Sequence, residues 1–373
     1  MHRVKAQNLP AAAPESRLVL HYTGADDDRG GVMSVIRALA GAGRFECVLG
    51  VNPGFAQGRV PPLRTLELPS ITGETINLRT LWRARVVARA VGTWLREDAA
   101  RVFHSHSRAG LVVALWLARR GERRVVASVH CYGRQRWFYR WAARQLDGRL
   151  YWLSPAMKRY YGIGDGSWTQ CVPGCVPPRT QPAVKRTERE PGMLRLGGVG
   201  ALVGWKGWHL VIEALAMLPR EVRVRIKFRH IGAPGGTPAA QRYAAWLQEQ
   251  TVLRGLTGSV EWLGEQSSAD SLLAESDCLV VASDREPFSI AVLEALAAGV
   301  PVLAADSGGA GDLLVADRTG WFFRSRDTTD LARALTLLVE TDALARASVP
   351  PEVVQPYLAP AVAERWAQVY AAL

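Results

Sequence analysis

The sequence predicts an α/β protein of two domains, each built around a parallel β-sheet. The chain has 373 residues, which exceeds one ordinary domain and suits two domains of about 180 residues each. Hydrophobic residues make up 48% of the chain, enough for sizeable cores rather than disorder. Short apolar runs alternate with glycine-rich turns and helical patterns, which is typical of βαβ units.

The first domain is predicted from an opening strand, loop and helix. Residues 17–23 (RLVLHYT) form a short apolar strand, GADDDRGG follows as a turn, and residues 32–42 have a helical pattern. This order is the first βα unit of a doubly wound fold. The loop lacks G-x-G-x-x-G, so the fingerprint of a dinucleotide-binding site is absent.

Two further strands of the first domain end in histidine. Residues 101–106 (RVFHSH) end at His106 and residues 125–130 (VVASVH) end at His130, before another strand at 149–154. Ligands gather at the carboxyl ends of parallel strands. A single histidine there is more often structural, but two on neighbouring strand ends leave a ligand role and a structural role equally open.

A second α/β domain follows a linker. Residues 177–192 (PPRTQPAVKRTEREPG) are rich in proline and charge and have no periodicity. We therefore place domains at 1–180 and 181–355, with a C-terminal helix at 356–373 that is expected to pack back towards the first domain. Strands are expected at 194–200, 225–232, 260–264, 278–282, 300–304 and 320–323, with a loop and helix over 203–218.

The charge is concentrated in the first half of the chain. Residues 1–180 carry 27 Lys and Arg against 12 Asp and Glu, whereas the remainder carries 19 against 22. A net charge of +15 on one half beside −3 on the other indicates an anionic partner on one side only. Nucleic acid and an anionic membrane surface are the two candidates.

The composition favours a cytoplasmic protein. Five cysteines, an odd number, do not suggest a disulfide framework. Cys171 and Cys175 have no second Cys/His pair at zinc-ligand spacing. No apolar stretch is long enough for a membrane span, and residues 1–16 lack the apolar core of a signal peptide. We expect a protein that is soluble in the cytoplasm or peripheral on the inner face of its membrane.

The most informative segment is SDREPFSIAVLEALAAGVPVLAADSGG. Glu286 and Glu294 stand eight residues apart, the second two turns into an alanine-rich helix. Phe288, Ser289 and Ile290 supply backbone N–H groups at the helix start, where unpaired donors and the helix dipole attract phosphate. A carboxylate nearby can accept hydrogen bonds from sugar hydroxyls. A nucleotide-sugar needs both features.

This segment resembles the E-x7-E signature of retaining glycosyltransferases of family 4. A bare pair of glutamates is a weak signal, but the extended string is specific. The resemblance implies the GT-B fold, with two facing Rossmann-like domains and a cleft between them. It also implies transfer of a hexose-type sugar from a nucleotide-diphosphate donor to a lipid-linked, lipopolysaccharide or polysaccharide acceptor. UDP and GDP are not distinguishable, and no further cofactor is expected.

The resemblance assigns roles to residues of the second domain. Glu286 is expected near the donor sugar and the reacting centre, Glu294 at the ribose, and Lys206 at the diphosphate. Ala201 stands where the family has a second phosphate-binding residue, an arginine, so the chain lacks one of the family's contacts to the donor. The nucleotide base is expected to be cradled, mainly by backbone groups, at Trp262 and Leu263.

The resemblance also assigns roles to residues of the first domain, the predicted acceptor-binding domain. Gly30 and Gly31 let the backbone approach a donor phosphate, and His106 is a catalytic candidate. His130 and Arg134 are candidates for the acceptor side of the cleft. No enzymic nucleophile and no metal are expected, because the protein contributes placement and stabilisation of the leaving group. The alternative, a metal at the Asp26-Asp27-Asp28 run, is less favoured.

Residues 134–144 (RQRWFYRWAAR) mix four arginines with four aromatic residues. The mixture is typical of a membrane interface. Stacking on single-stranded nucleic acid and a helix with an ordinary aromatic core face remain alternatives, and contact with an anionic membrane is preferred to nucleic acid.

Two other functions stay open at this point. One is a different enzyme on the same scaffold, such as a nucleotide-sugar epimerase or a phosphorylase. The other is a non-catalytic relative that binds nucleotide or sugar, which the alanine at position 201 keeps open.

Overall fold

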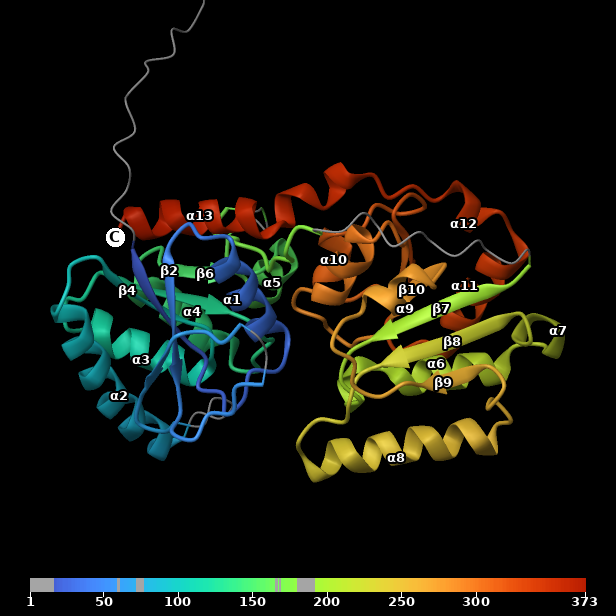
Figure 1. Ribbon diagram of the computed structural model, residues 1–373, viewed down its shortest axis with the longest axis horizontal. Coiled ribbons are helices and arrows are strands. Elements are labelled where there is room, and N and C mark those ends of the chain that lie inside the picture. Colours follow the sequence, from blue (N-terminus) through green and yellow to red (C-terminus); the bar gives the residue numbers. More distant parts are fainter. Residues whose placement is uncertain (1–16, 59–60, 72–76, 165–166, 168, 180–191) are drawn as a thin grey trace, which may run out of the picture. The chain divides into compact units, whose positions relative to one another are not determined.

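The computed structural model describes residues 17–58, 61–71, 77–164, 167, 169–179 and 192–373 (Figure 1). These residues form two six-stranded parallel sheets, which confirms the predicted α/β class. The described chain divides into two compact units. The first takes its residues from Met1–Val129, Ala142–Tyr151 and Ala363–Leu373, and the second from His130–Trp141 and Trp152–Val362. The predicted boundary at 180/181, most of the predicted linker and the N-terminal segment 1–16 lie outside the described residues.

The first sheet has the strand order β3-β2-β1-β4-β5-β6. The chain runs outward from β1 on one side and returns to start β4 on the other, so β1 and β4 flank the topological switch point. The register pairs His21 with His104 and Tyr22 with Ser105. The strands are β1 (Leu18–Tyr22), β2 (Glu46–Val51), β3 (Thr65–Glu67), β4 (Arg101–Ser105), β5 (Val125–Val129) and β6 (Leu150–Trp152).

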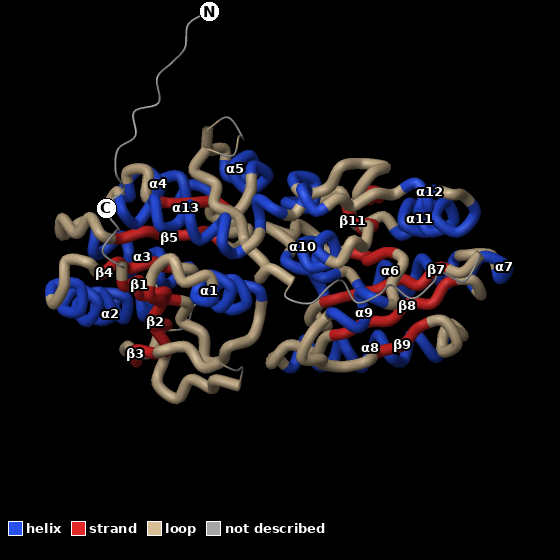
Figure 2. The backbone as a smooth tube through the Cα atoms, turned by 45° about the horizontal axis from the view of Figure 1, so that its top comes forward, coloured by secondary structure: helices blue, strands red, loops and turns tan. Residues whose placement is uncertain are grey.

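Helices accompany these strands, as Figure 2 shows. They are α1 (Gly31–Gly41), α2 (Leu78–Arg96), α3 (Arg108–Ala118) and α4 (Arg136–Leu146). The part of α4 up to Trp141 and the whole of α5 (Pro155–Tyr161) belong to the second unit. The strands expected at 17–23, 101–106, 125–130 and 149–154 are confirmed with shorter bounds. His106 and His130 therefore directly follow β4 and β5 rather than belonging to them.

The second sheet repeats this plan with the order β12-β11-β10-β7-β8-β9, so its switch point lies between β7 and β10. All four residues of β10 are buried, as expected for a strand covered on both faces. The strands are β7 (Leu194–Val199), β8 (Ile226–Ile231), β9 (Val260–Trp262), β10 (Cys278–Val281), β11 (Val302–Ala305) and β12 (Gly320–Phe323). The six strands predicted for this domain are confirmed.

The helices of the second unit enclose one large apolar core. Leu215, Leu247 and Leu335, from α6, α8 and α11, are completely buried in it. The helices are α6 (Trp208–Met217), α7 (Arg220–Arg223), α8 (Pro238–Leu253), α9 (Asp270–Ala274), α10 (Ile290–Ala297), α11 (Thr328–Glu340) and α12 (Ala343–Arg346). Short 3₁₀ turns follow β7 (η1, Gly204–Lys206) and β11 (η2, Gly308–Asp312), and two more lie at Pro351–Val353 and Gln355–Tyr357 (η3 and η4).

The chain ends in helix α13 (Ala359–Ala371), whose residues from Ala363 onward belong to the first unit. The ring of Tyr370 meets Phe45 edge to face at 5.0 Å, and Trp366 lies 4.4 Å from His104. The C-terminal segment therefore contributes aromatic side chains to the core of the first unit. None of the described helices combines the length and the hydropathy needed to cross a bilayer.

Candidate functional site

Two predicted site residues meet at the switch point of the second sheet. Lys206 ends the 3₁₀ turn after β7, and Glu286 lies in the loop between β10 and α10. The Lys206 ammonium nitrogen is 2.7 Å from Glu286 Oε2, and the side chains are only 16% and 8% exposed. The same ammonium lies 4.4 Å from the ring centre of Trp205. A buried ion pair therefore occupies the position at which open α/β sheets bind ligands.

Two glycines allow the backbone to close around this pair. A Cβ on Gly207 would lie 2.1 Å from the carbonyl oxygen of Ala282, and one on Gly308 would lie 2.0 Å from that of Glu286. Both glycines have a positive φ, which other residues adopt at a cost. The Gly309 N–H donates to the Glu286 carbonyl at 2.7 Å. The small residues of the Ser307-Gly308-Gly309 turn thus make room for the backbone of Glu286.

Helix α10 begins at Ile290, with Ser289 as its N-cap. The Ser289 hydroxyl accepts a hydrogen bond from the N–H of Val292 at 3.4 Å, which leaves the preceding N–H groups as the donors that a phosphate would use. Because the helix begins at Ile290, the partly exposed Glu294 lies one turn inside it, so the prediction of two turns was wrong.

The side chains of Phe288 and Ile290 pack closely around the backbone of Gly174. A Cβ on Gly174 would approach Ile290 to 2.8 Å and Phe288 to 3.0 Å, and the ring of Tyr357 lies 5.9 Å from that of Phe288. These contacts account for the two side chains, and a role of their backbone N–H groups at a phosphate stays a prediction.

Residues before and in α5 complete the surroundings of Glu286 within the second unit. The Ser154 hydroxyl donates to the carbonyl of Pro287 at 3.2 Å, and the N–H of Ala156 donates to Asp312 at 2.7 Å. Burial raises the pKa of Tyr132, and the negative charges of Asp312 and Glu286 raise it further. A neutral phenol therefore lies within electrostatic reach of the glutamate.

Sequence reasoning missed Tyr132, Ser154 and Asp312. The one available signal is that Tyr132 comes two residues after the strand-end His130. Burial lowers the pKa of His130 to about 4, so its imidazole is neutral at physiological pH, and Arg134 is exposed.

Trp262 and Leu263, the predicted base cradle, are largely engaged with the protein itself. The indole N–H of Trp262 donates to Thr251 Oγ1 at 3.1 Å. The Leu263 N–H donates to the carbonyl of His230, and its carbonyl accepts from Gln266. At the position of the missing arginine, the Ala201 carbonyl accepts the indole N–H of a tryptophan, Trp208.

In the first unit, Gly30 and Gly31 lie at the start of α1. Gly30 is the N-cap with φ of 91°, and no side chain caps the helix there. A Cβ on Gly30 would meet nothing within 4 Å, so backbone conformation rather than crowding requires the glycine.

The carboxylates of Asp26, Asp27 and Asp28 pair with other residues of the first unit. Asp28 pairs with Arg37 at 2.6 Å, and Asp26 accepts from the amide of the buried Asn52 at 2.9 Å. The N–H of Arg29 donates to Asp27 at 3.0 Å. These carboxylates are thus committed to protein partners. Asn52 is another residue that sequence reasoning missed.

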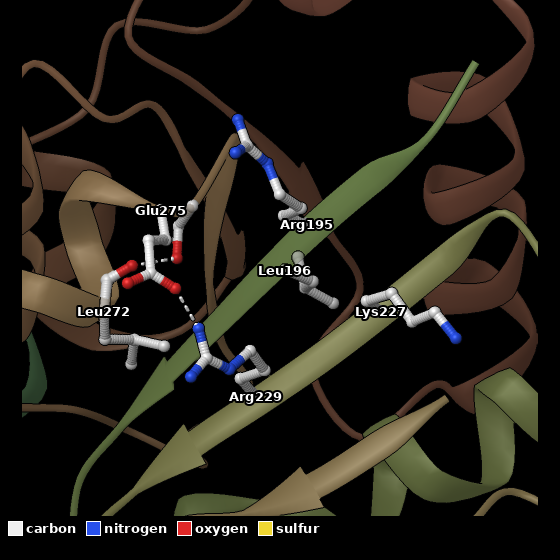
Figure 3. A pocket seen from close by; sticks show the side chains of 7 residues that line it. Arg195, Leu196, Lys227, Arg229, Leu272 and Glu275 are labelled. Carbon is white, nitrogen blue, oxygen red and sulfur yellow. Dashed lines mark hydrogen bonds and ion pairs between the residues drawn. The ribbon is translucent and has the colours of Figure 1, made fainter. Parts of the chain in front are cut away.

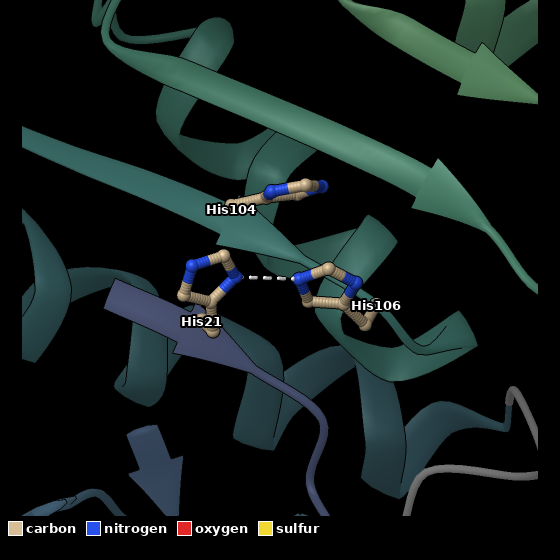
Figure 4. A group of neighbouring side chains, drawn as sticks. All are labelled: His21, His104 and His106. Carbon is tan, nitrogen blue, oxygen red and sulfur yellow. Dashed lines mark hydrogen bonds between the residues drawn. The ribbon is translucent and has the colours of Figure 1, made fainter. Parts of the chain in front are cut away.

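His106 lies at the carboxyl edge of the first sheet in a cluster with His21 and His104 (Figure 4). It is 6% exposed, and its Nε2 is 2.9 Å from His21 Nδ1. His21 and His104 were not predicted, although each stands in a strand that was.

A cavity of about 360 Å³ opens elsewhere, over the first residues of β7 and β8 (Figure 3). Its arginines already have acidic partners: Arg195 pairs with Asp277, and Arg229 with Glu261 and Glu275. It also lies toward the amino ends of the strands, away from Lys206 and Glu286. The arginines of this cavity are thus engaged by protein partners, and the cavity is not the candidate donor site.

Comparisons with known proteins identify relatives of this chain. Residues 185–349, just under half of the chain, match the family model described as "Glycosyl transferases group 1". The glycogen synthase of Mycobacterium tuberculosis (strain ATCC 25618 / H37Rv) is 26% identical over 211 residues, which cover 55% of this chain and 49% of that protein. The D-inositol 3-phosphate glycosyltransferase of Rhodococcus erythropolis is 30% identical over 193 residues, which cover 49% of this chain and 43% of that protein. The chain thus spans about half the length of the curated relatives it matches.

Among solved structures, Anabaena Alr3699/HepE in complex with UDP-glucose superposes with a TM-score of 0.73. The match covers 96% of this chain and 100% of that chain at 18% sequence identity. At this identity the likeness establishes the fold alone. The chain has the GT-B architecture of two Rossmann-like domains, and its residues 185–349 are related to the group 1 glycosyl transferases.

Proposed function

We propose that the chain is a retaining glycosyltransferase that moves a hexose-type sugar from a nucleotide-diphosphate sugar to a glycan or lipid-linked acceptor. The observation that carries the proposal is the buried Lys206–Glu286 pair at the β7/β10 switch point, beside the start of α10. A cation, a carboxylate and a helix N-terminus are the groups that a diphosphate bearing a sugar requires. The UDP-glucose bound to the HepE neighbour favours a UDP-sugar as the first donor to test.

Donor binding is proposed to exchange partners within this site. The diphosphate takes the place of Glu286 at the Lys206 ammonium and accepts hydrogen bonds from the N–H groups at the start of α10. Glu286 is then available to accept hydrogen bonds from the sugar hydroxyls, and Glu294 from the ribose. The exchange leaves Glu286 without its cation, and the diphosphate at the Lys206 ammonium and the sugar hydroxyls that donate to Glu286 offset that cost.

The proposed chemistry proceeds on one face of the sugar. The bond between the anomeric carbon and the diphosphate oxygen breaks, and the acceptor oxygen bonds to the same face of that carbon. The acceptor proton passes to the leaving diphosphate oxygen. The protein supplies placement and stabilisation of the leaving group, with Lys206 and the helix-end N–H groups in place of a metal ion.

The acceptor is proposed to bind through the first unit, at the carboxyl edge of its own sheet near His106. The curated relatives named above differ in what their names say they make, a glycogen and an inositol phosphate glycoside. The acceptor of this chain is accordingly proposed only as a class.

A thermal-shift screen with UDP, GDP, ADP and their sugars tests donor binding. A true donor at about 100 times its Kd stabilises the protein by roughly 2.7 kcal/mol. Transfer or hydrolysis of the donor, assayed with and without EDTA, then tests catalysis, and the rate with EDTA is expected to stay within about twofold. Binding without turnover would favour the non-catalytic relative that Ala201 keeps open, and a rate that collapses in EDTA and returns with Mg²⁺ would refute the metal-free mechanism.

Contact with an anionic membrane is a separate proposal. In the 134–144 segment Tyr139 is buried against Tyr161, whereas Trp137 is 65% exposed among arginines. An ordinary aromatic core face therefore explains Tyr139. It does not explain the exposed Trp137, which we propose for the membrane interface. On α2, Leu78 and Trp82 are 85% and 67% exposed on a helix that has five arginines and no acidic residue.

Vesicle co-sedimentation tests this proposal. Binding to anionic vesicles should fall between low and high salt, because each basic residue near the surface contributes about 1 kcal/mol within a Debye length of roughly 8 Å. Trp137→Ala and Trp82→Ala should each weaken the binding that survives at high salt. Preference for a single-stranded oligonucleotide over lipid would defeat the proposal.

A further inference from the structure

Three histidines lie together at the switch point of the first sheet (Figure 4). His21 in β1 and His104 in β4 are register partners on adjacent strands, and His106 follows β4. Their exposed fractions are 0%, 0% and 6%. The ring of His106 stands 4.0 Å from that of His104 and 5.1 Å from that of His21. The imidazole of His106 is thus enclosed by the other two.

Hydrogen bonds connect these rings to three other elements of the first unit, β2, β5 and α13. His21 Nδ1 lies 2.9 Å from His106 Nε2, and the other nitrogen of His21 lies 3.6 Å from Cys47 Sγ in β2. His104 Nδ1 lies 2.6 Å from the hydroxyl of Tyr370 in α13, and its Nε2 lies 2.8 Å from that of a serine, Ser128. Because both nitrogens of His104 are engaged by hydroxyl groups, the cluster is a hydrogen-bonded array rather than a three-histidine metal centre.

Two proton arrangements fit the contact between His21 and His106, and a thiol donor at Cys47 favours one of them. Burial lowers the pKa of His21 to about 3, so its ring is neutral and carries a single N–H. Burial raises the pKa of the Cys47 thiol to about 12, so the thiol keeps its hydrogen. A thiol that donates to His21 Nε2 leaves the histidine proton on Nδ1, where it points at His106 Nε2.

We infer that His21 is a positioning residue for His106: its Nδ1–H holds the imidazole at the end of β4 and fixes the His106 proton on Nδ1 rather than Nε2. The catalytic consequence rests on the proposed function. A His106 Nε2 that accepts from His21 is not free to take a proton from an acceptor hydroxyl. His106 then contributes to transfer by placement, and not as a general base through Nε2.

Two conservative variants of His21 separate this role from a general effect on packing. The amide of His21→Asn lies near the original Nδ1, whereas the amide of His21→Gln reaches the position of Nε2, towards Cys47. With ¹⁵N-labelled histidine, NMR should show His106 protonated on Nδ1 in the parent protein and in His21→Asn, but on Nε2 in His21→Gln. In the transfer assay, His21→Gln should lower kcat by about tenfold or more with little change in the KM for the nucleotide donor. His21→Asn should keep kcat close to that of the parent protein.

Several outcomes would overturn the inference. They are a His106 proton on Nε2 in the parent protein, equal kcat and tautomer in the two variants, or stoichiometric Co²⁺ binding that is lost in His21→Gln. Cys47→Ser, which retains a donor to His21 Nε2, is the matched control and should leave the His106 tautomer unchanged. Because the NMR measurement needs no turnover, the expected tautomers without any transferase activity would support the positioning of His106 and refute the proposed function.

Discussion

Replacing Lys206 with methionine should destabilise the second domain more than an ordinary substitution does. At 2.7 Å and an effective dielectric constant of about 20, its attraction to Glu286 is about 6 kcal/mol before desolvation is counted. Desolvation of two side chains that are 16% and 8% exposed offsets much of this gain. Lys206→Met removes the attraction but leaves the Glu286 carboxylate buried, which typically costs about 3–5 kcal/mol.

The assay is the melting temperature of the purified variants. For a domain of 150–250 residues, 1 kcal/mol shifts the melting temperature by about 2–4 °C, so Lys206→Met should lower it by about 6–20 °C. The double variant Lys206→Met with Glu286→Leu buries no charge at this position. It should recover most of the loss, because apolar replacements of a buried ion pair are often neutral or stabilising.

The double variant should regain thermal stability but not donor binding. Both variants lack the cation that the donor diphosphate is proposed to bind, so neither should show a thermal shift with a nucleotide-sugar. A Lys206→Met protein that melts within about 2 °C of the parent would refute the reasoning about the buried charge. A double variant that still binds the donor would refute the role of Lys206.

Three further predictions follow from the same structure. Glu294→Ala should weaken nucleotide binding more than Glu286→Ala, which should mainly lower turnover; small and equal effects in titration and kinetics would contradict the donor-site assignment. Gly308→Ala, whose Cβ would lie 2.0 Å from the Glu286 carbonyl, should lose activity and melt at lower temperature, whereas Gly311→Ala, with nothing within 4 Å, should change neither. Burial lowers the pKa of His21 to about 3 from 6.5, so the unfolded chain binds the extra proton and melting temperatures should fall as the pH drops from about 6.5 towards 4; a flat profile would argue against a neutral buried imidazole.

Local patterns in the chain were sufficient for much of the fold. Each of the predicted strands 278–282 and 300–304 is an apolar run closed by a turn, and the structure has β10 and β11 there. β3 was not predicted, because its three residues are too short to show a two-residue period. α8 was not predicted either, and it buries only four of its sixteen residues.

The sequence by itself determined the α/β class, the helix start at Ser289 and the candidate residues Lys206 and Glu286. These features depend on residues close together in the chain, where side-chain spacing and backbone conformation are coupled directly. Only the tertiary structure decided which distant residues meet. Lys206 and Glu286 are 80 residues apart, and His21 and His106 are 85 apart. Each pair meets because β7 lies beside β10 and β1 beside β4, and that strand order is set by how all the strands and helices pack together rather than by the pattern within any one of them.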